Sequence, residues 1–154
     1  MAHILIIDDD DIVAGMASAA LIDAGHACGW VSGGEEGLRL LAFKRPDVIL
    51  LDQDMPGMSG KEVMRTLRSS PDFYDLPIIM FTGMSGKQDE ATARYHGAQA
   101  YVRKPFNNAA LVRVVENVLE ARAERPQHTD LRDWMKQKAG WYREDEDAGL
   151  RRAI

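Results

Sequence analysis

Short apolar runs alternate with longer segments of mixed polarity along most of the chain. Five runs are brief, rich in β-branched or aromatic residues and bounded by turn residues, which is typical of strands. They are residues 3–7, 27–31, 47–51, 77–81 and 99–102. The segments between them have the length of helices and carry apolar positions at helical spacing. The pattern therefore predicts the element order βαβαβαβαβα.

Polar side chains mark where several of the predicted helices begin. A Ser followed three residues later by Glu or Gln is a capping box, in which the Ser oxygen accepts a hydrogen bond from an otherwise unpaired helix N–H. The three pairs are Ser32 with Glu35, Ser59 with Glu62, and Ser85 with Gln88. Asn107 is expected to cap the last helix.

Apolar stripes indicate the faces that the first and last helices should bury. In the first helix the expected stripe is Ile12, Val13, Met16, Ala20 and Leu21. In the last helix it is Leu111, Val114, Val115, Val118 and Leu119. Both helices are therefore expected to pack against a sheet.

The predicted strands are apolar throughout, which is typical of a parallel sheet covered on both faces. Right-handed crossovers then favour a doubly wound α/β architecture, and for five strands the common flavodoxin-like order is 2-1-3-4-5. We therefore predict a flavodoxin-like (βα)5 doubly wound parallel sheet with a C-terminal helical extension. This order brings the carboxyl ends of strands 1 and 3 together at a switch point, where ligands bind.

Length and charge limit the classes of protein that fit. A chain of 154 residues is long enough for one well-buried domain, expected at 1–122, with a linker and a short helical extension at 123–154. The net charge of −5 and the lack of a basic patch argue against nucleic acid as a partner.

The location expected from the sequence is the cytoplasm. No apolar run approaches the roughly 18 residues of a membrane span, and the sequence has no signal peptide pattern. The single cysteine, Cys28, cannot form an internal disulfide. A membrane partner is accordingly not expected.

The C-terminal extension is expected to contain a linker and one short helix. Apolar and aromatic side chains recur there at nearly helical spacing, among them Leu131, Trp134, Met135, Trp141 and Tyr142. A helix of about 12 to 14 residues is marginal alone, so it would need a surface to bury this side. Three alternatives remain open: packing on its own domain, pairing in a homodimer, or docking on a partner protein.

Charged and polar side chains follow four of the predicted strands, at the edge where ligands bind. They are Asp8 and Asp9 after the first strand, Asp52 and Asp54 after the third, Thr82 at the fourth, and Lys104 after the fifth. Carboxylates within about 4 Å of one another repel by roughly 4 kcal/mol per pair at an effective dielectric near 20. The cluster therefore needs a cation. The next two acids, Asp10 and Asp11, are better explained as a helix N-terminus.

Oxygen ligands without a supporting His or Cys favour Mg²⁺, with Mn²⁺ as the alternative, over zinc or copper. A divalent ion, an ammonium, a hydroxyl and a carboxylate together can handle a phosphoryl group. An Asp oxygen can attack phosphorus to give an aspartyl phosphate, while the cations offset the charge on the phosphoryl oxygens.

Four segments resemble the signature segments of the receiver domain of bacterial two-component response regulators. They are ILIIDDDD, VILLDQDMPGMSG, PIIMFTG and AYVRKPF, which occur in the family's order within about residues 2 to 122. The resemblance implies a stand-alone receiver of the chemotaxis-regulator type, phosphorylated on Asp52 by a histidine kinase or phosphotransfer protein. Such a protein signals by protein–protein interaction and is no conventional turnover enzyme.

The resemblance also implies roles for individual residues. Asp9 would bind Mg²⁺ directly and Asp8 would assist, with Asp52 and the backbone carbonyl of Asp54 completing the protein ligands. Thr82 and Lys104 would contact the phosphoryl group.

Tyr101 would be the switch aromatic, whose rotamer reports phosphorylation to a target protein on the face formed by the fourth helix, the fifth strand and the last helix. The resemblance further implies a cis peptide bond between Lys104 and Pro105, a position where proline makes cis accessible.

Asp54 leaves two questions open. As a further carboxylate near the reaction centre it is hypothesised to tune phosphoryl lifetime, either by repelling phosphoryl oxygens or by orienting water; a solvated loop carboxylate is the alternative. Asp52 and Asp54 also match the D-x-D motif of haloacid-dehalogenase-type phosphatases, with Asp52 as nucleophile and Asp54 as general acid/base. Against this alternative, that motif usually follows the first strand, in a longer chain.

Overall fold

A computed structural model describes residues 1–83 and 97–124 of the chain. The elements are β1 (His3–Ile7), α1 (Asp11–Asp23), β2 (Ala27–Val31), α2 (Gly34–Leu41), β3 (Val48–Leu51), α3 (Gly60–Arg68), β4 (Ile78–Thr82), β5 (Ala100–Arg103) and α5 (Asn108–Glu124). The helix expected to open at Ser85 and Gln88 lies outside the described residues, as do residues 125–154 of the expected extension. None of the described helices is both long and apolar enough to cross a bilayer.

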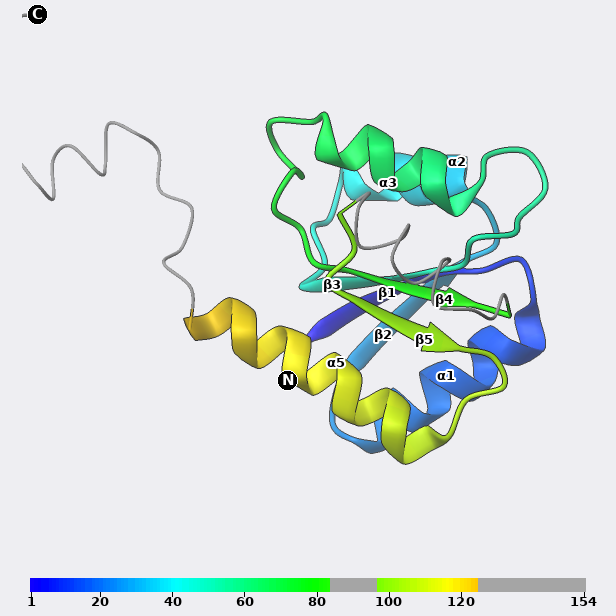
Figure 1. The fold of residues 1–154 in the computed structure, drawn as a ribbon, viewed down its shortest axis with the longest axis vertical. Helices are drawn as coiled ribbons and strands as arrows, with labels where there is room; N and C mark the ends of the chain where they lie inside the picture. The colour runs from blue at the N-terminus through cyan, green and yellow to red at the C-terminus, as the bar shows by residue number, and fades with distance from the viewer. Residues whose placement is uncertain (84–96, 125–154) are drawn as a thin grey trace, which may run out of the picture. The chain divides into compact units, whose positions relative to one another are not determined.

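The strands form one parallel sheet in the order β2-β1-β3-β4-β5, which confirms the predicted order (Figure 1). Ile7 of β1 pairs with Leu51 of β3, so the residues that follow them leave the sheet side by side. This register is what brings Asp8 and Asp52 to the same edge of the sheet.

Helices cover both faces of the sheet, with α1 and α5 on one face and α2 and α3 on the other (Figure 1). The strand side chains divide between two buried clusters: Ile4, Ile6 and Leu50 pack toward α1 and α5, while Leu5, Ile7 and Leu51 pack toward α2 and α3. Every residue of β3 is buried. Burial on both faces explains why the strands are apolar without alternation.

Two of the predicted helix caps are confirmed and one is wrong. Ser59 and Glu62 form the capping box of α3, and Asn107 Oδ1 accepts a hydrogen bond from Ala110 N at the start of α5. The N-cap of α2 is Gly33, which has no side-chain cap bond. Ser32 lies one residue earlier and hydrogen-bonds the Glu36 carboxylate instead, because the chain is still extended at Gly33.

The predicted stripe of α1 is partly wrong. Ile12 and Met16 are 71% and 52% exposed, while the buried residues of the helix are Ala14, Ala17 and Leu21. α1 is apolar on nearly all sides, so spacing alone could not determine which face the helix buries. Small alanines face the sheet, and two of the larger apolar side chains face solvent. The stripe of α5 is confirmed, with Leu111, Val115 and Val118 buried.

Candidate functional site

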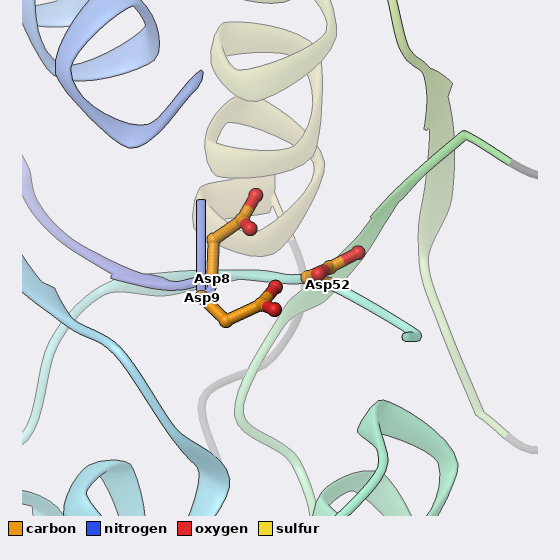
Figure 2. A group of neighbouring side chains, drawn as sticks. All are labelled: Asp8, Asp9 and Asp52. Carbon is orange, nitrogen blue, oxygen red and sulfur yellow. The ribbon is translucent and has the colours of Figure 1, made fainter. Parts of the chain in front are cut away.

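Three carboxylates meet at the carboxyl edge of the sheet. Asp8 and Asp9 follow β1 directly and Asp52 follows β3, and each offers one oxygen within 4.8 Å of the others (Figure 2). The strand ladder positions the first and last of them: Asp8 N donates to Val31 O at 3.1 Å, and Asp52 N donates to Ile7 O at 2.8 Å. The site is therefore built on the central strands of the sheet.

The three carboxylates differ in their exposure to solvent. Asp8 is fully buried and Asp52 is 4% exposed, whereas Asp9 is exposed. Buried carboxylates are costly unless they are paired with a cation or neutralised by a proton. The cluster is thus open to solvent on the side of Asp9 and closed on the side of Asp8.

Lys104 brings one ammonium group to the cluster from the segment after β5. Its Nζ lies 2.6 Å from Asp8 Oδ2 and 3.3 Å from Asp52 Oδ1, and 5.1 Å from the centre of the Phe81 ring. The bond between Lys104 and Pro105 is cis, as the family resemblance implied. Among the described residues, Lys104 therefore pairs with two of the three carboxylates, and the cluster keeps a net negative charge.

The charge balance shifts the pKa values of the paired groups. Burial raises the pKa of Asp52, and the neighbouring Asp8 charge raises it further; Lys104 opposes both, and the pKa reaches about 7. For Lys104, burial lowers the pKa, but the close pairing with the Asp8 carboxylate and the charge of Asp52 outweigh the effect of burial, and the pKa is raised. The site therefore favours additional positive charge beside Asp52.

The oxygens of Asp8 are not equally satisfied. Oδ1 accepts a hydrogen bond from Asp10 N at 2.9 Å, while Oδ2 is buried and has the ion pair with Lys104 as its contact, without a well-aligned hydrogen-bond donor in the described residues. An incompletely satisfied buried oxygen, excess negative charge and oxygen-only donors all fit a hard divalent cation. The carboxylate cluster can hold a metal ion.

The remaining predicted site residues lie around this cluster in different ways. Thr82 is the last residue of β4, where it pairs with Arg103 of β5. Tyr101 of β5 is half-buried and packs beside the cluster of apolar residues on the α2 and α3 face. Asp54 is exposed, and its carboxylate is not one of the three that lie within 4.8 Å.

Two residues that support the site were not singled out from the sequence. A Cβ atom on Gly60 would lie 2.2 Å from Asp52 O, so only glycine lets α3 begin so close to the Asp52 backbone. A glycine at the first position of the predicted helix is the sequence feature that could have indicated this close approach. Trp30 donates from Nε1 to Asp8 O at 2.8 Å, a contact between neighbouring strands that no local pattern indicates.

The fold and the site together define a flavodoxin-like α/β protein with an acidic site at its topological switch point. The family model of the response regulator receiver domain matches residues 4–116, and the chain belongs to this family. Receiver domains are signalling domains of two-component systems, controlled by phosphorylation of an aspartate. The function expected from the sequence is thus confirmed at the level of the family.

Known relatives agree with this assignment. The chain is 31% identical over 119 residues to protein PilH of Pseudomonas aeruginosa, covering 77% of this chain and 98% of PilH. It is 37% identical over 125 residues to the transcriptional regulatory protein AfsQ1 of Streptomyces coelicolor, covering 81% of this chain and 54% of AfsQ1. The chain therefore spans about half the length of this and several other curated relatives that it matches.

Solved structures show the same relationship. The chemotaxis response regulator CheY4 of Vibrio cholerae superposes with a TM-score of 0.72 at 31% identity, covering 77% of this chain and 98% of CheY4. The haloacid-dehalogenase alternative is wrong, since the family match is to receivers. The Asp52 and Asp54 pair follows β3 in this fold, and Asp54 is exposed outside the carboxylate cluster.

Proposed function

We propose that this protein accepts a phosphoryl group on Asp52 from a histidine kinase or a phosphotransfer protein. The observation that carries the proposal is the position of Asp52: almost buried, beside two further carboxylates, with Lys104 Nζ at 3.3 Å. This is the arrangement needed for a nucleophile whose charge is balanced by cations. The proposal keeps the cytoplasmic location expected from the sequence.

The residues fit a Mg²⁺ ion, with Mn²⁺ as the alternative. Asp9, Asp52 and the backbone carbonyl of Asp54 would hold the ion, and Asp8 would act through a bound water. When bound, the ion supplies positive charge that screens Asp52 from its neighbours and stabilises negative charge on phosphoryl oxygens.

Phosphorylation would proceed by attack of an Asp52 carboxylate oxygen on the phosphorus of a phosphohistidine. The new O–P bond forms as the P–N bond breaks, and the imidazole nitrogen keeps the electron pair and then takes a proton. Lys104 would move from the carboxylates to a phosphoryl oxygen, and the Thr82 hydroxyl would contact another. Positioning and charge balance supply most of the catalysis.

The second half of the cycle would be hydrolysis of the aspartyl phosphate by water. Water attacks phosphorus, the O–P bond to Asp52 breaks, and the carboxylate and inorganic phosphate are released. Each cycle restores the same Asp52, so the protein speeds its own phosphorylation and dephosphorylation but has no separate turnover substrate. Asp54 is proposed to tune the lifetime of the phosphorylated state.

The output would be a change in protein binding. Tyr101 lies at the centre of β5, paired with Met80 of β4, so a change at the end of β4 has a short path to this side chain. We propose that phosphorylation shifts the population of a binding-competent state, which a downstream protein recognises on the face that includes β5 and α5. The domain at 1–122 would carry this function, with 123–154 as an extension.

The test is to locate and count the phosphoryl group. The full chain is incubated with a small phosphodonor and Mg²⁺, the acyl phosphate is trapped by borohydride reduction, and the modified residue is identified by mass spectrometry. We expect up to one phosphoryl group per chain, on Asp52, and a loss of at least about 100-fold in the Asp52→Asn variant.

The matched control for this experiment is Asp11→Asn, which removes one exposed carboxylate near the site and should leave phosphorylation nearly unchanged. Modification at another residue would contradict the proposal. Continuous turnover of a generic phosphate ester would also contradict it.

A further inference from the structure

Trp30 is a large aromatic residue on the edge strand of the sheet. It lies in β2, paired with Ile6 of β1, and is 44% exposed. It belongs to neither of the two apolar core clusters. Burial in the core therefore does not explain its position, and its one polar atom becomes the feature to examine.

The indole Nε1 of Trp30 donates a hydrogen bond to the main-chain oxygen of Asp8 at 2.8 Å. The strand ladder ends just before this point: Asp8 N donates to Val31 O at 3.1 Å, and β2 ends at Val31. The carbonyl of Asp8 itself follows β1 and lies beyond the end of the paired strand β2, so it needs a donor other than a β2 amide. The Trp30 side chain supplies it.

With this bond, each polar group of Asp8 has a contact that restrains it. Its amide and carbonyl are bonded to β2, its Oδ1 accepts from Asp10 N, and its Oδ2 pairs with Lys104. Asp8 itself is fully buried, so packing also restrains it. The next residue, Asp9, lies between β1 and α1 and is exposed, so neither a strand nor burial restrains it.

The carbonyl of Asp8 and the amide of Asp9 belong to one planar peptide unit. A hydrogen bond that fixes the direction of the Asp8 carbonyl therefore also fixes the amide nitrogen and the Cα atom of Asp9, from which the Asp9 side chain extends. Groups that hold a metal ligand in place in this way commonly affect metal affinity, although they do not touch the ion.

We propose that Trp30 is a positioning residue for the acidic site. It orients the peptide between Asp8 and Asp9, and thereby sets how well the Asp9 carboxylate is placed to bind a divalent cation together with Asp52. The inference rests on the cation site of the proposed function. Cation affinity would then depend on a side chain of the edge strand β2 as well as on the carboxylates themselves.

The experiment measures Mg²⁺ affinity by calorimetry in the full chain and in Trp30→Phe, which keeps an aromatic ring and removes the donor. One neutral hydrogen bond corresponds to about a three- to tenfold change in an equilibrium constant, so Mg²⁺ should bind about three- to tenfold more weakly. Phe43→Leu is the control, because Phe43 is 89% exposed after α2, and it should leave affinity unchanged.

A second measurement separates positioning from general damage. The rate of phosphorylation by a small phosphodonor is followed against Mg²⁺ concentration. Trp30→Phe should need more Mg²⁺ for half the maximal rate, and should reach nearly the wild-type rate at saturation. If Trp30→Phe does not fold, Trp30 is replaced by benzothienylalanine in a Trp134→Phe, Trp141→Phe background, which removes the indole N–H alone.

The outcomes separate this inference from the proposed function. Equal Mg²⁺ affinity in Trp30→Phe and in the wild type overturns the inference and leaves the cation site intact. A lower maximal rate with an unchanged Mg²⁺ dependence also overturns it. If the wild type itself binds no Mg²⁺, the cation site of the proposed function fails, and the inference fails with it.

Discussion

The two edges of the sheet treat charged side chains in opposite ways. At the carboxyl edge, three carboxylates lie within 4.8 Å of one another, and Lys104 pairs with two of them, Asp8 and Asp52. At the amino edge, Asp75 lies between two cations, with Arg45 at 3.0 Å and Arg122 at 3.6 Å. The first arrangement has negative charge in excess, and the second does not.

Arg68 shows how completely polar groups are paired at the amino edge. Its guanidinium donates to the main-chain oxygens of Phe73, Tyr74, Leu76 and Gly97 and to Gln99 Oε1, at 2.6 to 3.4 Å. One side chain at the end of α3 thus ties together the segments that precede β4 and β5. Burial lowers the pKa of Arg68, and the charge of Asp75 opposes this.

The same residue type consequently has opposite properties at the two edges. Burial and Asp8 raise the pKa of Asp52. At Asp75, burial also raises the pKa, but the hydrogen bond and charge of Arg45 and the charge of Arg122 outweigh it, and the pKa is lowered. We conclude that the charged groups of the amino edge stabilise the fold. At the carboxyl edge, repulsion between carboxylates remains, and a bound cation can relieve it.

The largest expected effect is at the amino edge. Arg68→Ala removes several charge-assisted hydrogen bonds and leaves partly buried carbonyls without a donor, so the free energy of unfolding should fall by about 2 to 4 kcal/mol. Urea unfolding measures this loss. Mg²⁺ affinity should stay close to that of the wild type, because Arg68 lies at the opposite edge from the cluster.

Arg65→Ala is the matched control for Arg68→Ala, since Arg65 is an exposed arginine in the same helix. Its effect should be within about 0.5 kcal/mol. If the two variants lose equal stability, or if Arg68→Ala loses Mg²⁺ binding while folded, the contrast between the edges is wrong.

A smaller effect of opposite sign is expected at the carboxyl edge. Asp52→Asn relieves repulsion between two carboxylates and loses a contact with Lys104, which keeps its closer partner Asp8. Without divalent ions, the free energy of unfolding should therefore rise by about 1 kcal/mol, because the repulsion relieved slightly exceeds the attraction lost. Mg²⁺ should stabilise the wild type and not this variant.

Urea unfolding with and without Mg²⁺ tests this prediction. Asp11→Asn serves again as the control for removing one nearby charge. If Asp52→Asn is clearly less stable than the wild type without Mg²⁺, repulsion between the carboxylates does not outweigh the attraction of Asp52 to Lys104.

The smallest expected effect is the acid sensitivity of Asp75. Because the folded pKa of Asp75 lies below its unfolded value near 3.9, its contribution to stability is present above about pH 4 and is lost as the pH falls through the folded pKa. Asp75→Asn should be about 0.5 to 1 kcal/mol less stable than the wild type at pH 6.

The difference between Asp75→Asn and the wild type should shrink toward zero near pH 2. Thermal unfolding across this range measures it. Asp72→Asn, an exposed aspartate nearby, should follow the wild type throughout. A gap for Asp75→Asn that persists unchanged into acid would contradict the ion-pair explanation.

The sequence was sufficient for the carboxyl edge because topology does most of the positioning there. The residues that follow parallel strands lie at the same edge of the sheet. The sequence alone therefore predicts that Asp8, Asp9, Asp52 and Lys104 lie close together. Their order along the chain was enough, and the strand bounds were within one residue of those observed.

The amino edge could not be predicted in the same way. Arg45, Asp75 and Arg122 come from three separate segments and meet through side-chain length and direction, which no local pattern encodes. The contact of Trp30 with Asp8 has the same character. The buried face of α1 was missed because that helix is apolar on nearly all sides.

The most direct test of the account follows backbone amide NMR signals while Mg²⁺ is added to the full chain. If the carboxylate cluster binds the ion, the signals of Asp8 to Asp10 and of Asp52 to Asp54 should shift saturably, with little change at Arg68 and Asp75. Saturable shifts that centre on the amino edge, or none at Asp9 and Asp52, would contradict this prediction.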